Sequence, residues 1–156
     1  MSEVSEFLDK HPDVDTFDTI IPDLCGVIRG KRIARDGVRS IYKKGFQIPG
    51  SSVFLDVRGD TDDPGGMGVT DGDPDVTAHP VAGSLVMVPW FEKPMAQLLV
   101  SFFEEDGTPY IFDPRHVLQR VLDRFTDIGL RPVVALEQEF YLLDPEGGLQ
   151  GNPKPP

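Results

Sequence analysis

Residues 134–142 read Val-Ala-Leu-Glu-Gln-Glu-Phe-Tyr-Leu, an apolar run that carries the two carboxylates of Glu137 and Glu139. The branched and aromatic side chains over residues 132–143 predict a strand. Alternate residues of a strand face opposite ways, so both glutamates project from the same face. Neighbouring carboxylates repel one another and resist burial unless a positive charge lies between them.

Two interpretations of this pair stay open on spacing alone. A divalent cation is one possible partner, because Mg²⁺ and Mn²⁺ prefer oxygen ligands. The other is an edge strand whose polar face lies in water, with Gln138 and Tyr141 turned inward. Charge pairs on strands are more often solvated than buried, so spacing favours the second interpretation.

A helix is predicted immediately before this strand. Asp113 is a good capping residue, and Pro114 occupies the first helical position, where a missing N–H costs nothing. Apolar residues then recur at spacings of three and four until Gly129 ends the pattern. The apolar positions are Val117, Leu118, Val121, Leu122, Phe125 and Ile128.

The first 112 residues predict a mixture of short helices and strands. Two helices are expected, at residues 1–12 and from a capping Asp36 to Gly45. Strands are expected at residues 19–33, broken by Pro22 and with Gly30 in a turn or bulge, and at residues 51–57, 85–90 and 97–103. Asp106-Gly107 predicts a hairpin turn leading into residues 110–112. Cys25 is expected to be a small buried side chain.

Charge and composition exclude several classes of protein. With 15 basic and 26 acidic residues the net charge is 15 − 26 = −11, which argues against nucleic-acid binding and against anionic membrane surfaces. The chain has one cysteine, so an internal disulfide framework is excluded. It carries no signal-peptide pattern and no apolar run of membrane-spanning length, so a cytoplasmic protein is expected.

Residues 59–83 are rich in aspartate and glycine and are expected to form a long surface loop. Asp60, Asp62 and Gly65 fit an EF-hand calcium pattern at three positions. Pro64 and Asp71 break that pattern at two others, and helices are not expected on either side. A solvated loop is therefore the favoured interpretation.

The order of these segments resembles the glutamine synthetase family. The resemblance extends from about residue 18 to residue 144, and its ordered set of motifs is more specific than any one of them. The motifs are Gly50-Ser51-Ser52, Pro89-Trp90, residues 106–110 followed by Asp113-Pro114-Arg115, and residues 134–142.

The resemblance implies an α+β fold in three parts. An N-terminal helix and lead-in would occupy residues 1–17, a β-grasp domain residues 18–112, and the truncated start of the catalytic α/β domain residues 113–156. Later elements of the family are missing from these residues, so the 156-residue chain is expected to be inactive alone. A free-standing β-grasp regulatory or assembly module is the alternative, which the retained Glu137 and Glu139 argue against.

The resemblance also implies a chemistry, that of an ATP-dependent glutamate–amine ligase. Glu137 and Glu139 would bind the divalent metal ions, Mg²⁺ or Mn²⁺, that clamp the phosphates of ATP while the γ-carboxylate of glutamate is phosphorylated. Ammonia or a larger amine would then displace phosphate from the γ-glutamyl phosphate. Members of the family assemble as rings in which the β-grasp domain completes the active site of a neighbour, so a homo-oligomeric ring is expected.

One departure from the family concerns the amine. Members that use ammonia have an aspartate before the Gly-Ser-Ser stretch, where this chain has Pro49. Residues Pro49, Gly50, Ser51 and Ser52 are therefore expected to lie near the amine. They look more like those of members that ligate glutamate to larger amines such as polyamines.

Overall fold

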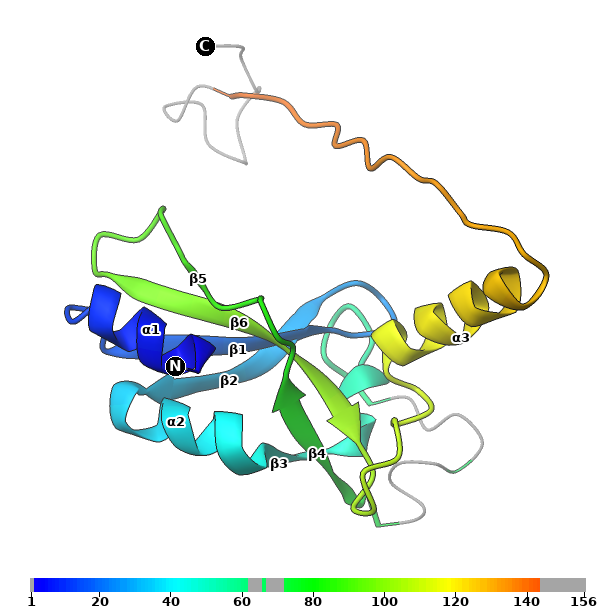
Figure 1. The fold of residues 1–156 in the computed structure, drawn as a ribbon, viewed down its shortest axis with the longest axis horizontal. Coiled ribbons are helices and arrows are strands. Elements are labelled where there is room, and N and C mark those ends of the chain that lie inside the picture. The colour runs from blue at the N-terminus through cyan, green and yellow to red at the C-terminus, as the bar shows by residue number, and fades with distance from the viewer. Residues whose placement is uncertain (1, 62–65, 67–71, 144–156) are drawn as a thin grey trace.

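The computed structural model describes residues 2–61, 66 and 72–143. Its centre is a curled sheet of mixed direction, with the strand order β2-β1-β6-β4-β3 and with β5 paired to β6 as well (Figure 1). The strands are β1 (Thr16–Pro22), β2 (Ile28–Ala34), β3 (Phe46–Pro49), β4 (Asp75–Pro80), β5 (Val86–Met87) and β6 (Met95–Phe103).

The long strand β6 joins the two halves of this sheet. Its residues 95–99 run parallel to β1, and its residues 100–103 pair antiparallel with β4. The side chains of Ala96, Leu98, Val100 and Phe102 alternate along one face and are at most 1 % exposed. Because strand side chains alternate, this one strand contributes to the core along its full length. The strand predicted at residues 97–103 is confirmed.

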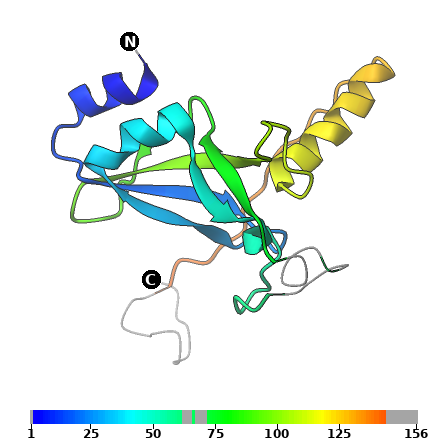
Figure 2. The ribbon, with the colours of Figure 1, turned by 90° about the horizontal axis from the view of Figure 1, so that it is seen from below.

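Two helices cover one face of the sheet in the part of the chain that the structure describes. Figure 2 shows α1 (Glu3–Lys10) and α2 (Arg35–Lys44) on the same side. Val4 and Leu8 of α1 and Val38 of α2 are buried with Phe17 and Leu98 of the strands. Both helices were predicted, but α2 begins at a cap residue, Ala34, whose side chain accepts no hydrogen bond. The prediction that Asp36 is the cap is wrong, because Asp36 lies within the first turn.

A second buried cluster fills the other end of the same face. It contains Ile48 of β3, Val76 of β4 and Phe102 of β6, covered by Val53 and Phe54. Val53 ends a short 3-10 helix, η1 (Gly50–Val53), which occupies the place predicted for a strand at residues 51–57. Phe54 N–H donates to the carbonyl of Ser51 at 2.8 Å. This local bond replaces the ladder that a strand would need, so the strand prediction is wrong.

The turn of the β1–β2 hairpin lies between Pro22 and Ile28, within the segment predicted as one broken strand. The carboxylate of Asp23 accepts from Cys25 N–H at 2.9 Å, from Val27 N–H at 2.8 Å and from Arg29 Nε at 2.9 Å. Cys25 is exposed on this turn, so the prediction that it is buried is wrong. Gly30, which was predicted to form the turn or bulge, lies inside β2 opposite Ile20.

Other boundaries also differ from prediction. Strand β4 lies within residues 59–83, which were predicted to be loop throughout, and only two of residues 85–90 form a strand. Part of the proposed calcium pattern, including Asp62, Pro64 and Asp71, lies outside the described residues. After Asp106-Gly107 the chain returns to β6 through Tyr110 N–H, which donates to the Phe102 carbonyl at 3.0 Å.

The predicted capping of α3 (Pro114–Asp127) is confirmed. Asp113 is fully buried and accepts from Arg115 N–H at 2.7 Å and from His116 N–H at 3.4 Å. It also accepts from Phe102 N–H of β6 at 2.6 Å, which fastens the start of the helix to the sheet. Most of the apolar face of α3 is exposed, with Phe125 38 % and Leu118 58 % exposed, whereas Leu122 is half-buried. None of the helices described here is both long and apolar enough to cross a membrane.

Candidate functional site

The predicted carboxylate pair lies beyond α3 in an extended segment. Residues 131–143 form no helix or strand, and Figure 1 shows them running back from the end of α3 as an extended trace that lies apart from the sheet. Leu136 is 93 % exposed and Tyr141 is 92 % exposed. The strand predicted at residues 132–143 is therefore wrong for the isolated chain, because a strand needs a neighbour to complete its hydrogen bonds.

Glu137 and Glu139 are both exposed in this segment. Within the described ranges, no group of three or more histidine, cysteine, aspartate or glutamate residues is placed to hold a metal ion. The two carboxylates alone supply oxygen donors of the type that Mg²⁺ and Mn²⁺ prefer. They provide only part of a coordination shell, and their assignment as ligands stays a prediction.

The other predicted site residues lie together at the end of β3. Pro49 is the last residue of that strand and is exposed, whereas Gly50 and Ser51 begin η1 and are buried. Gly50 N–H donates to the carbonyl of Pro74 at 3.1 Å, and Tyr110 Oη donates to the carbonyl of Gly50 at 3.3 Å. A Cβ at position 50 would lie 2.9 Å from Tyr110 Oη. A larger residue at position 50 would therefore force Tyr110 or the neighbouring backbone to shift.

Ser51 is held by a residue 22 positions along the chain. Its N–H donates to Asp73 Oδ1 at 3.2 Å and its Oγ donates to Asp73 Oδ2 at 2.9 Å. Asp73 has a φ of +50°, a left-handed conformation that aspartate and asparagine tolerate better than most residues. The sequence analysis placed Asp73 in a solvated loop at residues 59–83 and missed this contact, since nothing local marks a partner so distant in the sequence.

A cavity of about 230 Å³ opens beside this contact. Gly50 and Ser51 line it together with the rings of Tyr110 and Phe112, and three acidic residues, Asp73, Asp75 and Glu104, line it as well. Polar donors and acceptors thus share the cavity wall with two aromatic rings. Such a mixture suits a small ligand with a polar end and an apolar body.

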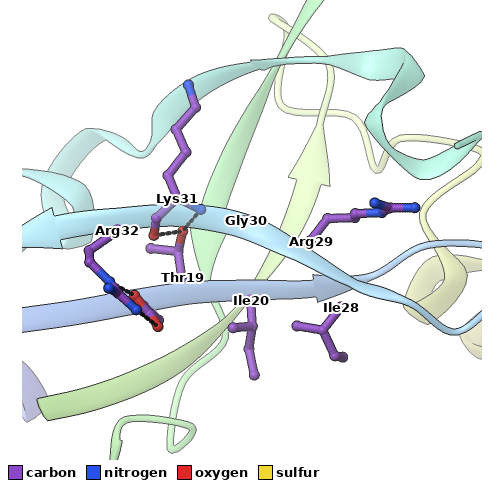
Figure 3. A pocket seen from close by; sticks show the side chains of 8 residues that line it. Thr19, Ile20, Ile28, Arg29, Gly30, Lys31 and Arg32 are labelled. Carbon is purple, nitrogen blue, oxygen red and sulfur yellow. Dashed lines mark hydrogen bonds and ion pairs between the residues drawn. The ribbon is translucent and has the colours of Figure 1, made fainter. Parts of the chain in front are cut away.

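A second hollow, of about 340 Å³, lies on the face of the β1–β2 hairpin (Figure 3). Ile20 and Ile28 point to one side of the hairpin and Lys31 to the other. Arg32 pairs with Asp18 at 2.8 Å, and the hydrogen bond and charge of Asp18 raise the pKa of Arg32. Lys31 Nζ donates to the carbonyl of Gln47 at 2.8 Å, which ties β2 to β3. These cations serve the fold, and the hollow joins none of the predicted site residues.

Comparison with known proteins places residues 49–52 and residues 137–139, the two candidate regions, within one protein family. Residues 112–154 match the model of the glutamine synthetase catalytic domain. Over 154 residues, 99 % of the chain, it is 37 % identical to the gamma-glutamylputrescine synthetase PuuA of Escherichia coli (strain K12). This chain belongs to the glutamine synthetase family.

Other relatives of the family agree. The chain is 31 % identical over 146 residues to the glutamate–isopropylamine ligase of a Pseudomonas species, covering 91 % of the chain. It is 30 % identical over 128 residues to the glutamine synthetase of Pyrococcus abyssi, covering 82 % of the chain. The aligned regions make up 32 %, 31 % and 26 % of PuuA, the ligase and the synthetase. The chain thus spans about a third of the length of these relatives.

Solved structures confirm a shared fold. The structure of GmaS with ADP superposes with a TM-score of 0.62 at 23 % identity, over 82 % of this chain and 26 % of that one. A glutamine synthase homologue superposes with a TM-score of 0.62 at 21 % identity, over 74 % of this chain and 27 % of the other. At these identities the likeness concerns the fold alone. The mixed α/β architecture with a curled sheet is therefore typical of this family.

Proposed function

We propose that this chain acts in an ATP-dependent glutamate–amine ligase. In this reaction the γ-carboxylate of glutamate takes the terminal phosphoryl group of ATP, and an amine then displaces phosphate from the acyl phosphate to form an amide. The observation that carries the proposal is the 37 % identity to a gamma-glutamylputrescine synthetase along 99 % of the chain. Similarity to a glutamate–isopropylamine ligase supports the same reaction class.

The proposal includes a division of the chain into three parts. Residues 1–17 would be a lead-in, residues 18–112 a β-grasp domain and residues 113–156 the start of the catalytic domain. The hairpin of β1 and β2, with α2 packed on it and β6 parallel to β1, supports the β-grasp assignment. The match to the catalytic-domain model from residue 112 onward supports the second boundary.

Glu137 and Glu139 would hold the divalent metal ions of this reaction. Bound Mg²⁺ or Mn²⁺ would neutralise charge on the transferring phosphoryl group. The two glutamates would offer carboxylate oxygens from alternate positions of an extended chain. Two carboxylates complete no metal site, so we expect the 156-residue polypeptide alone to bind Mn²⁺ weakly and to hydrolyse no ATP.

Residues Pro49, Gly50, Ser51 and Ser52 would lie beside the incoming amine. Pro49 offers no charge to attract ammonium, and the cavity next to Gly50 and Ser51 has two aromatic walls. Both features support an amine that carries a carbon chain. We further propose a homo-oligomeric ring, because the two candidate regions, on η1 and beyond α3, would then come together between subunits.

The test is an assay of phosphate release by the protein as its gene encodes it. ATP and glutamate are held fixed while ammonium, putrescine and ethanolamine are compared. We expect a larger amine to give the highest kcat/KM. Preference for ammonium would contradict the proposed amine class but keep the ligase. No glutamate-dependent release with any amine would contradict the ligase itself.

Substitution of Glu139 tests the metal assignment. Glu139→Gln keeps the size of the side chain but removes the charge. We expect kcat to fall by at least about a hundredfold, because a metal ion contributes several kcal/mol to transition-state stabilisation. The midpoint of thermal unfolding should stay within about a degree, because surface substitutions change stability little. Glu105→Gln, on the exposed turn after β6, is the matched control. Full activity of Glu139→Gln would remove this residue from the metal site.

A further inference from the structure

The hydroxyl of Ser51 has a fixed direction. An ionised carboxylate has no proton to give, so in the contact between Ser51 and Asp73 the hydroxyl must be the donor. Its proton points at Asp73 Oδ2, 2.9 Å away, and the adjacent N–H points at Oδ1. The two bonds together fix both the side chain and the backbone of Ser51. Only the lone pairs of Oγ are then left for a ligand.

The surroundings hold the acceptor in place. Ser51 is only 7 % exposed, so water cannot readily replace Asp73 as a partner. Gly50 beside it is fastened from two sides, by the carbonyl of Pro74 and by Tyr110 Oη. The turn at residues 50–51 is therefore rigid, and Ser51 lines the cavity as an oriented hydrogen-bond acceptor.

We propose that Asp73 is a positioning residue that makes Ser51 an acceptor for the N–H groups of the amine substrate. This inference rests on the proposed ligase function and specifies how the amine is recognised. An acceptor of fixed direction selects a ligand that donates hydrogen bonds, as an amine or ammonium does, over one that only accepts them. Such an acceptor would also orient the amine at the wall of the cavity, which attraction by charge alone would not do.

Asp73→Asn separates orientation from folding. Asparagine keeps the side-chain size and tolerates the left-handed φ of this position, but its NH₂ group can donate to Ser51 Oγ and reverse the direction of that hydrogen bond. In the protein as its gene encodes it, we expect KM for the preferred amine to rise about tenfold, because the variant loses one charge-assisted hydrogen bond to the amine. The kcat and the KM values for ATP and glutamate should stay unchanged.

Two further variants complete the test. Glu105→Gln, on the exposed turn after β6, removes one negative charge outside the cavity, and KM for the amine should then change less than twofold. Ser51→Ala removes the acceptor and leaves Asp73 in place, so it should raise KM for the amine as Asp73→Asn does. It also decides the matter if Asp73→Asn does not fold.

The possible results are distinguishable. An equal rise of KM in Glu105→Gln would overturn the inference, because loss of negative charge in general would then explain the effect. Equal changes in the KM values for all three substrates, or a normal amine KM in Ser51→Ala, would also overturn it. In both cases an active wild-type protein leaves the ligase function intact. An inactive wild type contradicts the ligase function, and the inference fails with it.

Discussion

Buried carboxylates shape this protein at the scale of single residues. Asp23 and Asp113 are nearly or fully excluded from solvent, where a charge is costly unless it is well hydrogen-bonded. Both accept several N–H groups, Asp23 within the β1–β2 turn and Asp113 at the start of α3. Each therefore fixes a loop whose backbone groups would otherwise lack partners.

What the sequence reveals about a residue depends on how far away its partner lies. The capping role of Asp113 was predictable, because the partners at residues 115 and 116 and the following proline are local. The contact between Ser51 and Asp73 was not, since 22 residues separate them. Nor could the partners of Asp113 across the sheet be foreseen. Identification of Glu137 and Glu139 as a pair needed only their spacing, but their role came from the family resemblance.

Tyr42 makes stability depend on pH in alkaline solution. Its Oη is buried and makes no hydrogen bond among the described residues, and burial, followed by the negative charge of Glu3, raises the pKa of Tyr42. The unfolded chain then loses this proton at lower pH than the folded one, so stability must fall as pH rises above about 10, the ordinary tyrosine value.

Tyr42→Phe tests this prediction. Phenylalanine has no proton to lose, so the fall of the unfolding midpoint between pH 9 and pH 11 should be smaller in the variant than in the wild type. Urea unfolding followed by circular dichroism across this range measures the difference, and Tyr141→Phe, on the exposed segment beyond α3, is the control. Parallel pH profiles of wild type and Tyr42→Phe would contradict the assignment.

At the scale of elements, prediction succeeded where a segment carries its own pattern. The alternation along β6 and the periodicity of α1, α2 and α3 are intrinsic to those segments, and all four were found. β4 was missed because Asp75-Val-Thr-Ala-His-Pro becomes a strand through pairing with β3 and β6, which is a property of its neighbours. Residues 132–143 show the converse, a strand-like pattern without a partner strand.

The β1–β2 hairpin depends on Gly30 more than on the glycine of its turn. A Cβ at Gly30 would lie 1.6 Å from the carbonyl oxygen of Thr19, whereas one at Gly26 would meet nothing within 4 Å. Both glycines have positive φ, so substitution costs about 1 kcal/mol in backbone strain at either position.

We therefore expect Gly26→Ala and Gly30→Ala to differ in stability. Gly26→Ala should lower the free energy of unfolding by about 1 kcal/mol. Gly30→Ala must also push β2 away from β1, and overpacking of this kind adds about 1–3 kcal/mol. Denaturant unfolding of the two variants side by side measures the gap. If Gly30→Ala were as stable as Gly26→Ala, the close approach of the two strands would be wrong.

At the scale of the whole molecule, the two candidate regions lie on different parts of the chain. Residues 49–52 lie at the end of β3 and in η1, whereas Glu137 and Glu139 lie in the segment that follows α3 (Figure 1). The fold class could be predicted from the sequence, because the order of motifs matched a family. That residues 131–143 form no strand here could not be predicted, because strand formation depends on which neighbouring surfaces are present rather than on the local sequence.

We expect Pro49 to influence which amine the proposed ligase prefers. In relatives that use ammonia, an aspartate in the corresponding place would face a cationic substrate, and opposite charges a few ångströms apart near a protein surface interact by several kcal/mol. Pro49 is exposed at the end of β3, so an aspartate side chain fits there without repacking the core.

We expect Pro49→Asp to shift selectivity toward ammonium. In the protein as its gene encodes it, kcat/KM for ammonium should rise about tenfold relative to that for putrescine, equivalent to about 1.4 kcal/mol. Pro49→Ala removes the ring without adding charge and should leave the ratio unchanged, which separates electrostatics from backbone effects. The shift should also weaken as ionic strength rises, because salt screens exposed charges. An unchanged ratio in Pro49→Asp would mean that the amine does not approach residue 49, and the amine site would have to lie elsewhere.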